Sequence, residues 1–174
     1  ISKKENVFVI GEFEKKEKPL AKDKNHIVLV NPSNAGNIGT IMRSALGFGF
    51  SDIAIVRPAV DVFDPKAVRA SMGALFSLNV KYYESFEEYL SDIGDSDGMS
   101  RTMYPFMLQA KKYLHEVKAT GLSSLIFGNE ATGLPQKFLE VGTPVIIPIT
   151  DKVDSLNLPI AASIAMHKVF ADGM

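Results

Sequence analysis

Short apolar segments alternate with segments of helical periodicity along most of this 174-residue chain, and this alternation constrains the fold more than any other feature. Five segments that are apolar or rich in β-branched residues predict strands: 26–31, 53–56, 78–83, 125–127 and 145–147. Helical spacing and capping signals predict helices near 37–46, 64–76, 85–93, 104–117, 135–141 and 159–170. Parallel strands need crossover connections, which helices usually provide. We therefore expect an α/β fold, a mostly parallel sheet with helices on both faces.

The length of the chain fits one globular domain, and only its first 25 residues differ in character. The lysine run from Lys15 to Lys24 is interleaved with acidic residues, which is more typical of a solvated linker than of an RNA clamp. The segment 94–102 is polar and reads as a loop or a short irregular strand. The sequence thus predicts an N-terminal extension or linker at 1–25 and one domain at 26–174.

Composition excludes several classes of site. The chain has no cysteine, so disulfides, thiol nucleophiles and thiolate metal ligands are ruled out. Its three histidines, His26, His115 and His167, are too scattered to indicate a metal site. No stretch approaches the roughly 18 apolar residues that cross a membrane. We expect a cytoplasmic protein without metal or membrane partner, and the net charge of −1 requires any RNA site to be a local basic patch.

Three polar segments, 31–43, 127–135 and 147–157, directly follow or overlap the ends of three predicted strands. In an open parallel sheet, ligands bind beyond the carboxyl ends of the strands. We expect the three segments to converge on one site. The glycines in them match neither a dinucleotide-binding nor a P-loop pattern.

The residue pattern leaves the roles of single polar side chains open. Arg43 lies on a helix whose other face is apolar, and is either a surface residue or reaches back toward the preceding loop. Glu130 either caps the helix near Pro135 or orients a ligand. Asn157 is a candidate N-cap of the last helix, with assistance from Ser155, or a ligand-binding residue.

Taken together and in order, the motifs resemble those of the SpoU/TrmH family of RNA 2′-O-methyltransferases, within the knotted SPOUT superfamily. The matching motifs are Asn31–Gly39 running on to Arg43, Phe127–Glu130 with Gly133, and Ile147–Pro148 followed by 155–157 and an alanine-rich helix. The resemblance covers about 26–170. One residue departs from it, because Ala131 stands where many relatives have a second glycine. We expect an altered loop shape there and an active protein.

The resemblance implies a trefoil knot near the C-terminus, a homodimer, and S-adenosylmethionine as cofactor. It implies cofactor contacts from main-chain groups around Gly128, Ile147 and Leu156, with a further contact from the loop around Ser100. It places five residues in the catalytic machinery: Asn34, Arg43, Glu130, Ser155 and Asn157.

The implied reaction is methyl transfer to a ribose 2′-hydroxyl of tRNA or rRNA. A guanidinium is hard to deprotonate in a protein, so we expect Arg43 to clamp the target phosphate rather than act as the base. The alternatives are a tRNA base methyltransferase of the same superfamily and a non-catalytic RNA-binding protein that kept the fold. The Asn34–Arg43 motif argues against the first alternative, and the intact set of polar residues argues against the second.

Overall fold

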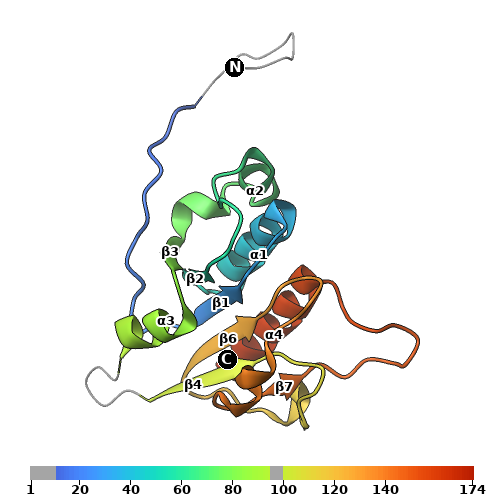
Figure 1. The fold of residues 1–174 in the computed structure, drawn as a ribbon. Coiled ribbons are helices and arrows are strands. Elements are labelled where there is room, and N and C mark those ends of the chain that lie inside the picture. The colour runs from blue at the N-terminus through green and yellow to red at the C-terminus, as the bar shows by residue number, and fades with distance from the viewer. Residues whose placement is uncertain (1–10, 95–99) are drawn as a thin grey trace.

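The computed structural model describes residues 11–94 and 100–174, and a five-stranded parallel sheet forms its centre (Figure 1). The spatial order of the strands is β3-β2-β1-β6-β4, and every pair is parallel. The bounds are β1 His26–Val30, β2 Asp52–Val56, β3 Asn79–Tyr83, β4 Arg101–Pro105 and β6 Leu122–Phe127. Two short parallel strands, β5 Lys112–Tyr113 and β7 Val145–Ile146, form a second small sheet.

Helices cover both faces of the main sheet, which confirms the predicted α/β class. The α-helices are α1 Ala35–Gly47, α2 Pro65–Ala70, α3 Phe86–Ile93 and α4 Leu158–Asp172. Three 3₁₀ turns complete the order: η1 Ala74–Ser77, η2 Leu114–Glu116 and η3 Gln136–Glu140. The trefoil knot that the resemblance implies stays a prediction. Among the described residues, no helix is both long and apolar enough to cross a membrane.

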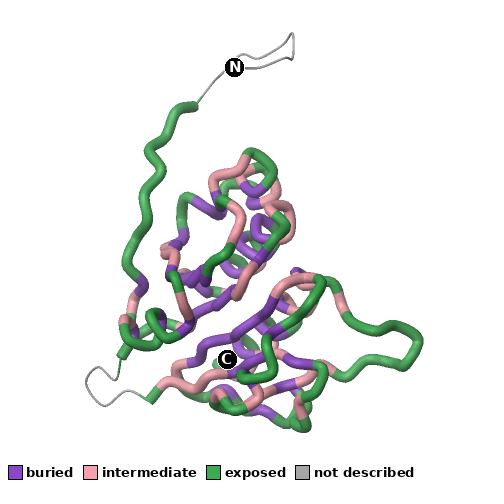
Figure 2. The backbone as a smooth tube through the Cα atoms, in the orientation of Figure 1, coloured by how far each residue is buried: buried purple, intermediate pink, exposed green. Residues whose placement is uncertain are grey.

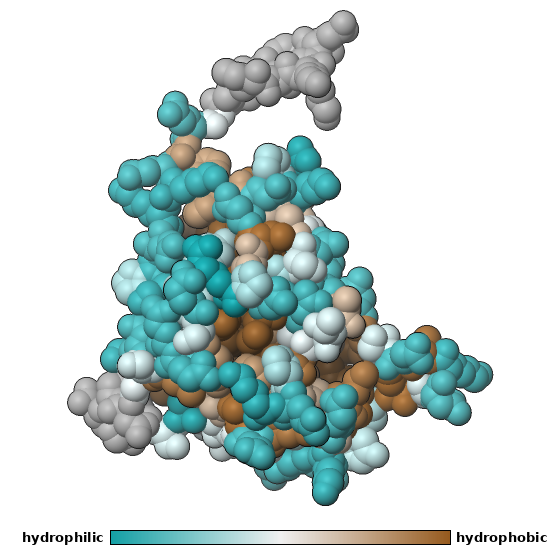
Figure 3. Space-filling view, viewed as in Figure 1, coloured by the Kyte–Doolittle hydropathy of each residue, from teal (hydrophilic) through white to brown (hydrophobic). Residues whose placement is uncertain are grey.

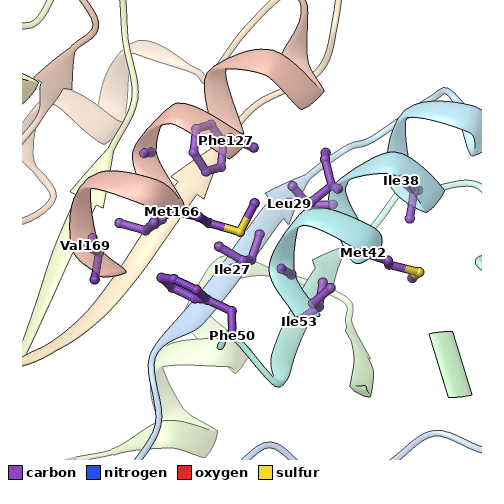
Figure 4. Close-up of a cluster of buried hydrophobic side chains, with 14 of the residues drawn as sticks. Ile27, Leu29, Ile38, Met42, Phe50, Ile53, Phe127, Met166 and Val169 are labelled. Atoms are coloured by element: carbon purple, nitrogen blue, oxygen red, sulfur yellow. The ribbon is translucent and has the colours of Figure 1, made fainter. Parts of the chain in front are cut away.

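The central strands are apolar over most of their length because both of their faces are buried, and their buried polar residues lie toward their amino ends: His26, Asp52, Ser123 and Ser124. Alternate residues of β1 point to opposite sides, so Ile27 and Leu29 pack under α1 and α4 while Val28 packs on the α3 side. Figure 4 shows the first of these clusters, in which Met166 of α4 approaches β1. Full burial of one such side chain contributes about 1.5–3 kcal/mol, so these two layers fix the sheet between the helices.

Helix α1 begins after the first polar segment and packs closely on α2. Asn34 is its N-cap, and its side-chain oxygen accepts a hydrogen bond from the Asn37 main-chain N–H at 3.1 Å. At Gly39 a Cβ atom would lie 2.3 Å from the Ala67 carbonyl oxygen and 2.7 Å from the Ala70 Cβ. Only glycine permits this close approach between the two helices.

Three of the expected helices differ in the structure, and the one predicted over 135–141 is the 3₁₀ turn η3. The helix predicted over 64–76 ends at Ala70, because Met72 and Gly73 adopt positive φ angles of 50° and 89°, and a 3₁₀ turn follows. The helix predicted over 104–117 is wrong. That segment contains the end of β4, a loop, β5 and η2.

The wrong helix has a physical cause in how its apolar residues are buried. Met107 belongs to the core on the α3 side of the sheet, whereas Leu114 and Val117 belong to the core under α1 and α4. The segment passes from one core to the other. Its apolar residues have the spacing of a helix, but they pack into two different cores and not on one helix face.

The described part of the N-terminal segment, 11–25, runs along the outer edge of β3 and is mostly exposed (Figure 2). The Lys18 main-chain N–H donates to the Val80 carbonyl at 3.2 Å, and the Tyr82 main-chain N–H donates to the Glu17 carboxylate at 3.3 Å. The segment thereby covers part of an edge that would otherwise present unpaired backbone groups. Its separation from the domain as an extension or linker stays a prediction.

At the amino edge of the sheet, a buried polar cluster centres on His26. The ring Nε2 lies 2.8 Å from the Ala21 carbonyl, which can only accept, so this nitrogen carries the proton. The Tyr89 hydroxyl lies 3.0 Å from Nδ1 and 2.6 Å from the Ser124 hydroxyl. Burial, and secondarily the nearby charge of Arg101, lowers the pKa of His26 from 6.5 to about 4.

We expect acid to destabilise the fold through His26. Between pH 6.5 and about 4 the unfolded chain binds a proton at this histidine that the native protein does not. The stability that neutral His26 contributes is therefore present above pH 6.5 and is lost as the pH falls toward 4, by as much as about 3 kcal/mol. Urea unfolding at about pH 7 and about pH 4.5 measures this loss. The variant His26→Gln should show a smaller loss between the two pH values, and an equal loss would contradict the assignment.

Candidate functional site

A cavity of about 240 Å³ lies at the carboxyl edge of the sheet. Its walls come from the segments that follow β4, β6 and β7 and from the first turns of α4. Figure 3 shows apolar surface in the hollows of one face of the molecule, with polar side chains over the surrounding ridges. Of the three polar segments expected to converge, the second, after β6 of the main sheet, and the third, after β7 of the small sheet, line this cavity, whereas no residue of the first segment does.

The inner wall of the cavity is apolar, and its rim is polar. Phe106 and Phe127 stack with ring centroids 4.6 Å apart and an interplanar angle of 14°. The apolar lining comes from β4, β6, β7 and α4 together with their following loops: Phe106, Met107, Phe127, Leu134, Val145, Ile146, Ile147, Leu158 and Ala161. Such a cavity suits a ligand with one flat apolar part and several polar groups.

Glu130 joins the first polar segment to the cavity. It lines the cavity, and one carboxylate oxygen accepts hydrogen bonds from the Ser33 main-chain N–H at 3.0 Å and from the Ser33 hydroxyl at 2.8 Å. The other oxygen accepts from the Asn34 main-chain N–H at 3.1 Å and from the Asn37 side chain at 3.2 Å. A carboxylate from one loop thus holds the loop before α1, rather than capping the turn near Pro135.

The same contacts keep Glu130 ionised. Partial burial acts to raise its pKa, but the hydrogen bonds from Ser33 and Asn37 outweigh burial and hold the pKa of Glu130 below its ordinary value. A general base that works near neutral pH needs a pKa close to the working pH. Glu130 is therefore suited to positioning the loop at 31–37 and not to accepting a proton.

The loop after β6 closes on itself around Asn129. The Asn129 side chain donates to the Asn31 carbonyl at 2.9 Å and accepts from the Ala131 main-chain N–H at 2.9 Å. Ala131, the departure from the family pattern, is exposed and is not among the residues with positive φ. Its Cβ therefore causes no backbone strain, and the expectation of an active protein stays a prediction.

The structure brings together most of the residues selected from the sequence. Five of the nine selected residues line the cavity: Gly128, Glu130, Ile147, Ser155 and Leu156. Asn34 reaches it through Glu130, and Asn157 lies beside it as the exposed N-cap of α4. The Asn157 side chain makes no capping hydrogen bond, and the Asn157 carbonyl instead accepts from Ile160 and Ala161. Its side chain is thus available to a ligand.

Of the four selected residues that do not line the cavity, the other two, Arg43 and Ser100, lie away from it. Arg43 is exposed on the side of α1 that faces away from the sheet, and it makes no hydrogen bond or ion pair with the described residues. Ser100 directly precedes β4 and so lies at the amino edge of the sheet, opposite to the cavity. The end of β4 that reaches the cavity supplies Phe106–Gln109 instead.

Sequence reasoning missed the wall at Phe106–Gln109 because it placed these residues in a helix. The signal that could have found them is Tyr104-Pro105-Phe106, an aromatic pair around a proline, which suits the end of a strand as well as a helix start. Asn129 and Ser33 lie in the quoted motifs, but their hydrogen-bonding roles depend on contacts across about 97 residues of sequence.

The fold and the cavity together define a class: a parallel α/β domain with a ligand site at the carboxyl edge of its sheet. Comparison with known proteins gives the family. The model of the SpoU rRNA Methylase family matches residues 24–167, and the chain therefore belongs to this family.

Individual relatives agree with this membership. An uncharacterized tRNA/rRNA methyltransferase of Synechocystis sp. is 31% identical over 143 residues, which are 82% of this chain and 51% of the relative. A 23S rRNA (adenosine(1067)-2′-O)-methyltransferase of Streptomyces laurentii is 32% identical over 138 residues, which are 76% of this chain and 49% of the relative. This chain thus spans about half the length of these two curated relatives.

Solved structures show the same fold. The SpoU methyltransferase AviRb from Streptomyces viridochromogenes, in complex with the cofactor AdoMet, superimposes with a TM-score of 0.81 at 28% identity. The match covers 88% of this chain and 62% of that one. An AdoMet-bound rRNA methyltransferase from Sinorhizobium meliloti gives a TM-score of 0.79 at 28% identity, over 90% of this chain and 61% of that one.

Proposed function

We propose that this protein is an S-adenosylmethionine-dependent RNA methyltransferase that transfers a methyl group to a ribose 2′-hydroxyl of tRNA or rRNA. One observation carries the proposal: the second and third family motifs line one cavity, and Glu130 ties the first motif to it by four hydrogen bonds. The names of the family and of its relatives supply the reaction class.

The cavity fits the cofactor in shape and chemistry. Stacked Phe106 and Phe127 form part of an apolar wall, which suits a purine ring. Ser155 and Leu156 line the cavity, and their main-chain N–H groups make no hydrogen bond with the described residues, so they are available to polar groups of a ligand. In our proposal Gly128, Ile147 and Leu156 hold the cofactor, and Phe106–Gln109 take the place expected for Ser100.

The protein supplies mainly orientation to this reaction. When bound, S-adenosylmethionine supplies an electrophilic methyl group on a sulfonium. In-line attack by a hydroxyl gains much of its rate from alignment. We assign Arg43 to the phosphate beside the target ribose, because its planar guanidinium can bind phosphate through two parallel hydrogen bonds. Four further residues position the loop before α1, the loop before α4 and the ribose: Asn34, Glu130, Ser155 and Asn157.

Transfer of tritiated methyl groups to unmodified total RNA, followed by nucleoside analysis, tests the proposal. We expect label in 2′-O-methylated nucleosides. Label on a base with unmodified ribose would instead support a base methyltransferase of the same superfamily. Calorimetry without detectable cofactor binding, together with no transfer, would support a non-catalytic RNA-binding protein.

We also propose that the active form is a homodimer with composite sites. Helix α4 packs on its own sheet and on α1, yet it also carries apolar side chains on its exposed side. Ile160 and Ile164 are exposed to 53% and 39%, and such a helix is usually buried on every side. In the dimer that we propose, Arg43 of one subunit acts at the cavity of the other. The separation of Arg43 from the cavity of its own chain supports this arrangement.

We expect Ile164→Lys to produce a folded monomer without methyl transfer. A two-fold interface uses the same patch twice, so one substitution places two charges in it. Light scattering measures the molar mass, and circular dichroism checks the fold. The exposed Leu90→Lys on α3 is the matched control and should stay dimeric. Full activity in a monomeric Ile164→Lys protein would contradict the composite site.

A further inference from the structure

Beside the cavity, the described segment 111–118 carries an exposed aromatic pair among lysines. The Tyr113 and His115 rings stack with centroids 5.5 Å apart and an interplanar angle of 9°. Both residues are exposed, whereas Leu114 and Val117 between and after them are buried and anchor the segment in the core. The pair is therefore a flat surface on a fixed support and not a loose loop tip.

The segment is locally basic in a chain of net charge −1. Lys111, Lys112 and Lys118 are exposed, and none of them forms an ion pair with the described residues. The single acidic residue of the segment, Glu116, accepts a hydrogen bond from the Tyr113 main-chain N–H at 2.8 Å. Lys118 lies near the Asp172 carboxylate. Lys111 and Lys112, beside a single carboxylate that is already hydrogen-bonded, form the kind of local patch that an RNA backbone requires.

The position of the pair connects it to the proposed active site. Tyr113 in β5 is the register partner of Ile146 in β7, so the two residues lie on neighbouring strands about 5 Å apart. Ile146 lines the cavity, and so do Phe106–Gln109, which lead into this segment. A base stacked on Tyr113 would thus lie next to the cavity.

We infer that the Tyr113–His115 pair is a stacking platform for an unpaired base of the substrate RNA near the target nucleotide, with Lys111 and Lys112 binding the adjacent phosphates. Proteins recognise unpaired RNA bases by stacking them on aromatic side chains and by placing cations along the backbone. The inference rests on the proposed function, and it adds a preference for single-stranded RNA at this site.

Fluorescence anisotropy with a labelled single-stranded RNA of mixed sequence, and with a blunt duplex of the same length, tests the platform directly. We expect tighter binding of the single strand by the wild-type protein. The double variant Tyr113→Ala, His115→Ala should bind it about tenfold more weakly or worse, as expected for the loss of base stacking. Tyr113→Phe keeps the ring and should bind like wild type. Phe76→Ala, which removes an exposed aromatic ring near β3, is the matched control and should not change binding.

The lysines are tested by salt titration. Lys111→Ala, Lys112→Ala should lower the slope of log affinity against log salt by roughly one for each lost phosphate contact, which a purely structural effect would not do. Equal affinity of the wild-type protein and the Tyr113→Ala, His115→Ala variant for the single strand would contradict the stacking platform. A change of molar mass in the aromatic variant would overturn it too, because the pair would then serve a protein interface. The anisotropy assay measures RNA binding and does not require methyl transfer. If the wild-type protein bound RNA but transferred no methyl group, the proposed function would be contradicted, and the test of the stacking platform would still stand.

Discussion

Replacing Arg43 by alanine is expected to lower methyl transfer by about two to three orders of magnitude, the usual effect of removing one essential charged or hydrogen-bonding group from an active site. The structure gives the reason for a selective loss. Arg43 is exposed, does not line the cavity of its own chain, and makes no side-chain hydrogen bond or ion pair with the described residues. Cofactor affinity should therefore stay within a few-fold of wild type. Calorimetry with S-adenosylmethionine and a tritium-transfer assay measure the two effects separately.

The control variants distinguish the effect of the planar guanidinium of Arg43 from the effect of its positive charge. Arg43→Lys keeps the charge but loses the planar fork, so we expect partial activity. Arg69→Ala removes an exposed arginine from α2 and should leave transfer nearly unchanged. Collapse of cofactor binding in a folded Arg43→Ala protein would contradict the assignment of Arg43 to RNA.

The composite site has its own test, in which Arg43→Ala is mixed with Leu156→Asp. Leu156 lines the cavity and is only partly buried, so this change should block the cofactor without unfolding the chain. Each variant alone should be inactive. Random pairing makes about half of the dimers mixed, each with one intact site, so about a quarter of wild-type activity should return. No recovery in demonstrated mixed dimers would place both residues in the same subunit's site.

Gly128→Ala is expected to abolish cofactor binding. A Cβ atom at this position would lie 2.1 Å from the Gly133 carbonyl carbon and 2.3 Å from the Leu134 main-chain nitrogen. These are backbone atoms that cannot rotate away, so the loop from 128 to 134 must move as a whole. Overpacking of this kind costs about 1–3 kcal/mol of stability, and a misplacement of about 1 Å can lower a rate about 100-fold.

Urea unfolding and calorimetry with the cofactor measure both consequences of Gly128→Ala. Gly121→Ala is the matched control, because nothing lies within 4 Å of a Cβ at that position. Normal cofactor affinity in the Gly128 variant would show that the loop after β6 does not form the cofactor site.

The sequence predicted the frame of the fold through local patterns that survive in the structure. The apolar strands at 26–30, 52–56 and 122–127 are buried on both faces, so their composition alone identifies a covered parallel sheet. Local periodicity failed at 104–117, where neighbouring apolar residues pack into different cores. One-dimensional spacing cannot show which partner buries a residue.

The sequence also predicted only part of the candidate site. The motifs and their order indicated which segments converge, and most of their selected residues line the cavity. Ser100 was placed by analogy alone, and the direction of β4 carries it to the opposite edge. The role of Glu130 depended on three residues nearly 100 positions earlier in the chain.

The sequence by itself determined the α/β class, the family and the segments that form the site, because each of these depends on local composition and order. Only the tertiary structure decided that Glu130 is an ionised organiser of the loop before α1, that Arg43 stands apart from its own cavity, and that the end of β4 supplies a wall. Hydrogen bonds, burial and charge act between atoms that are close in space, and the chain brings those atoms together from positions that no local pattern connects.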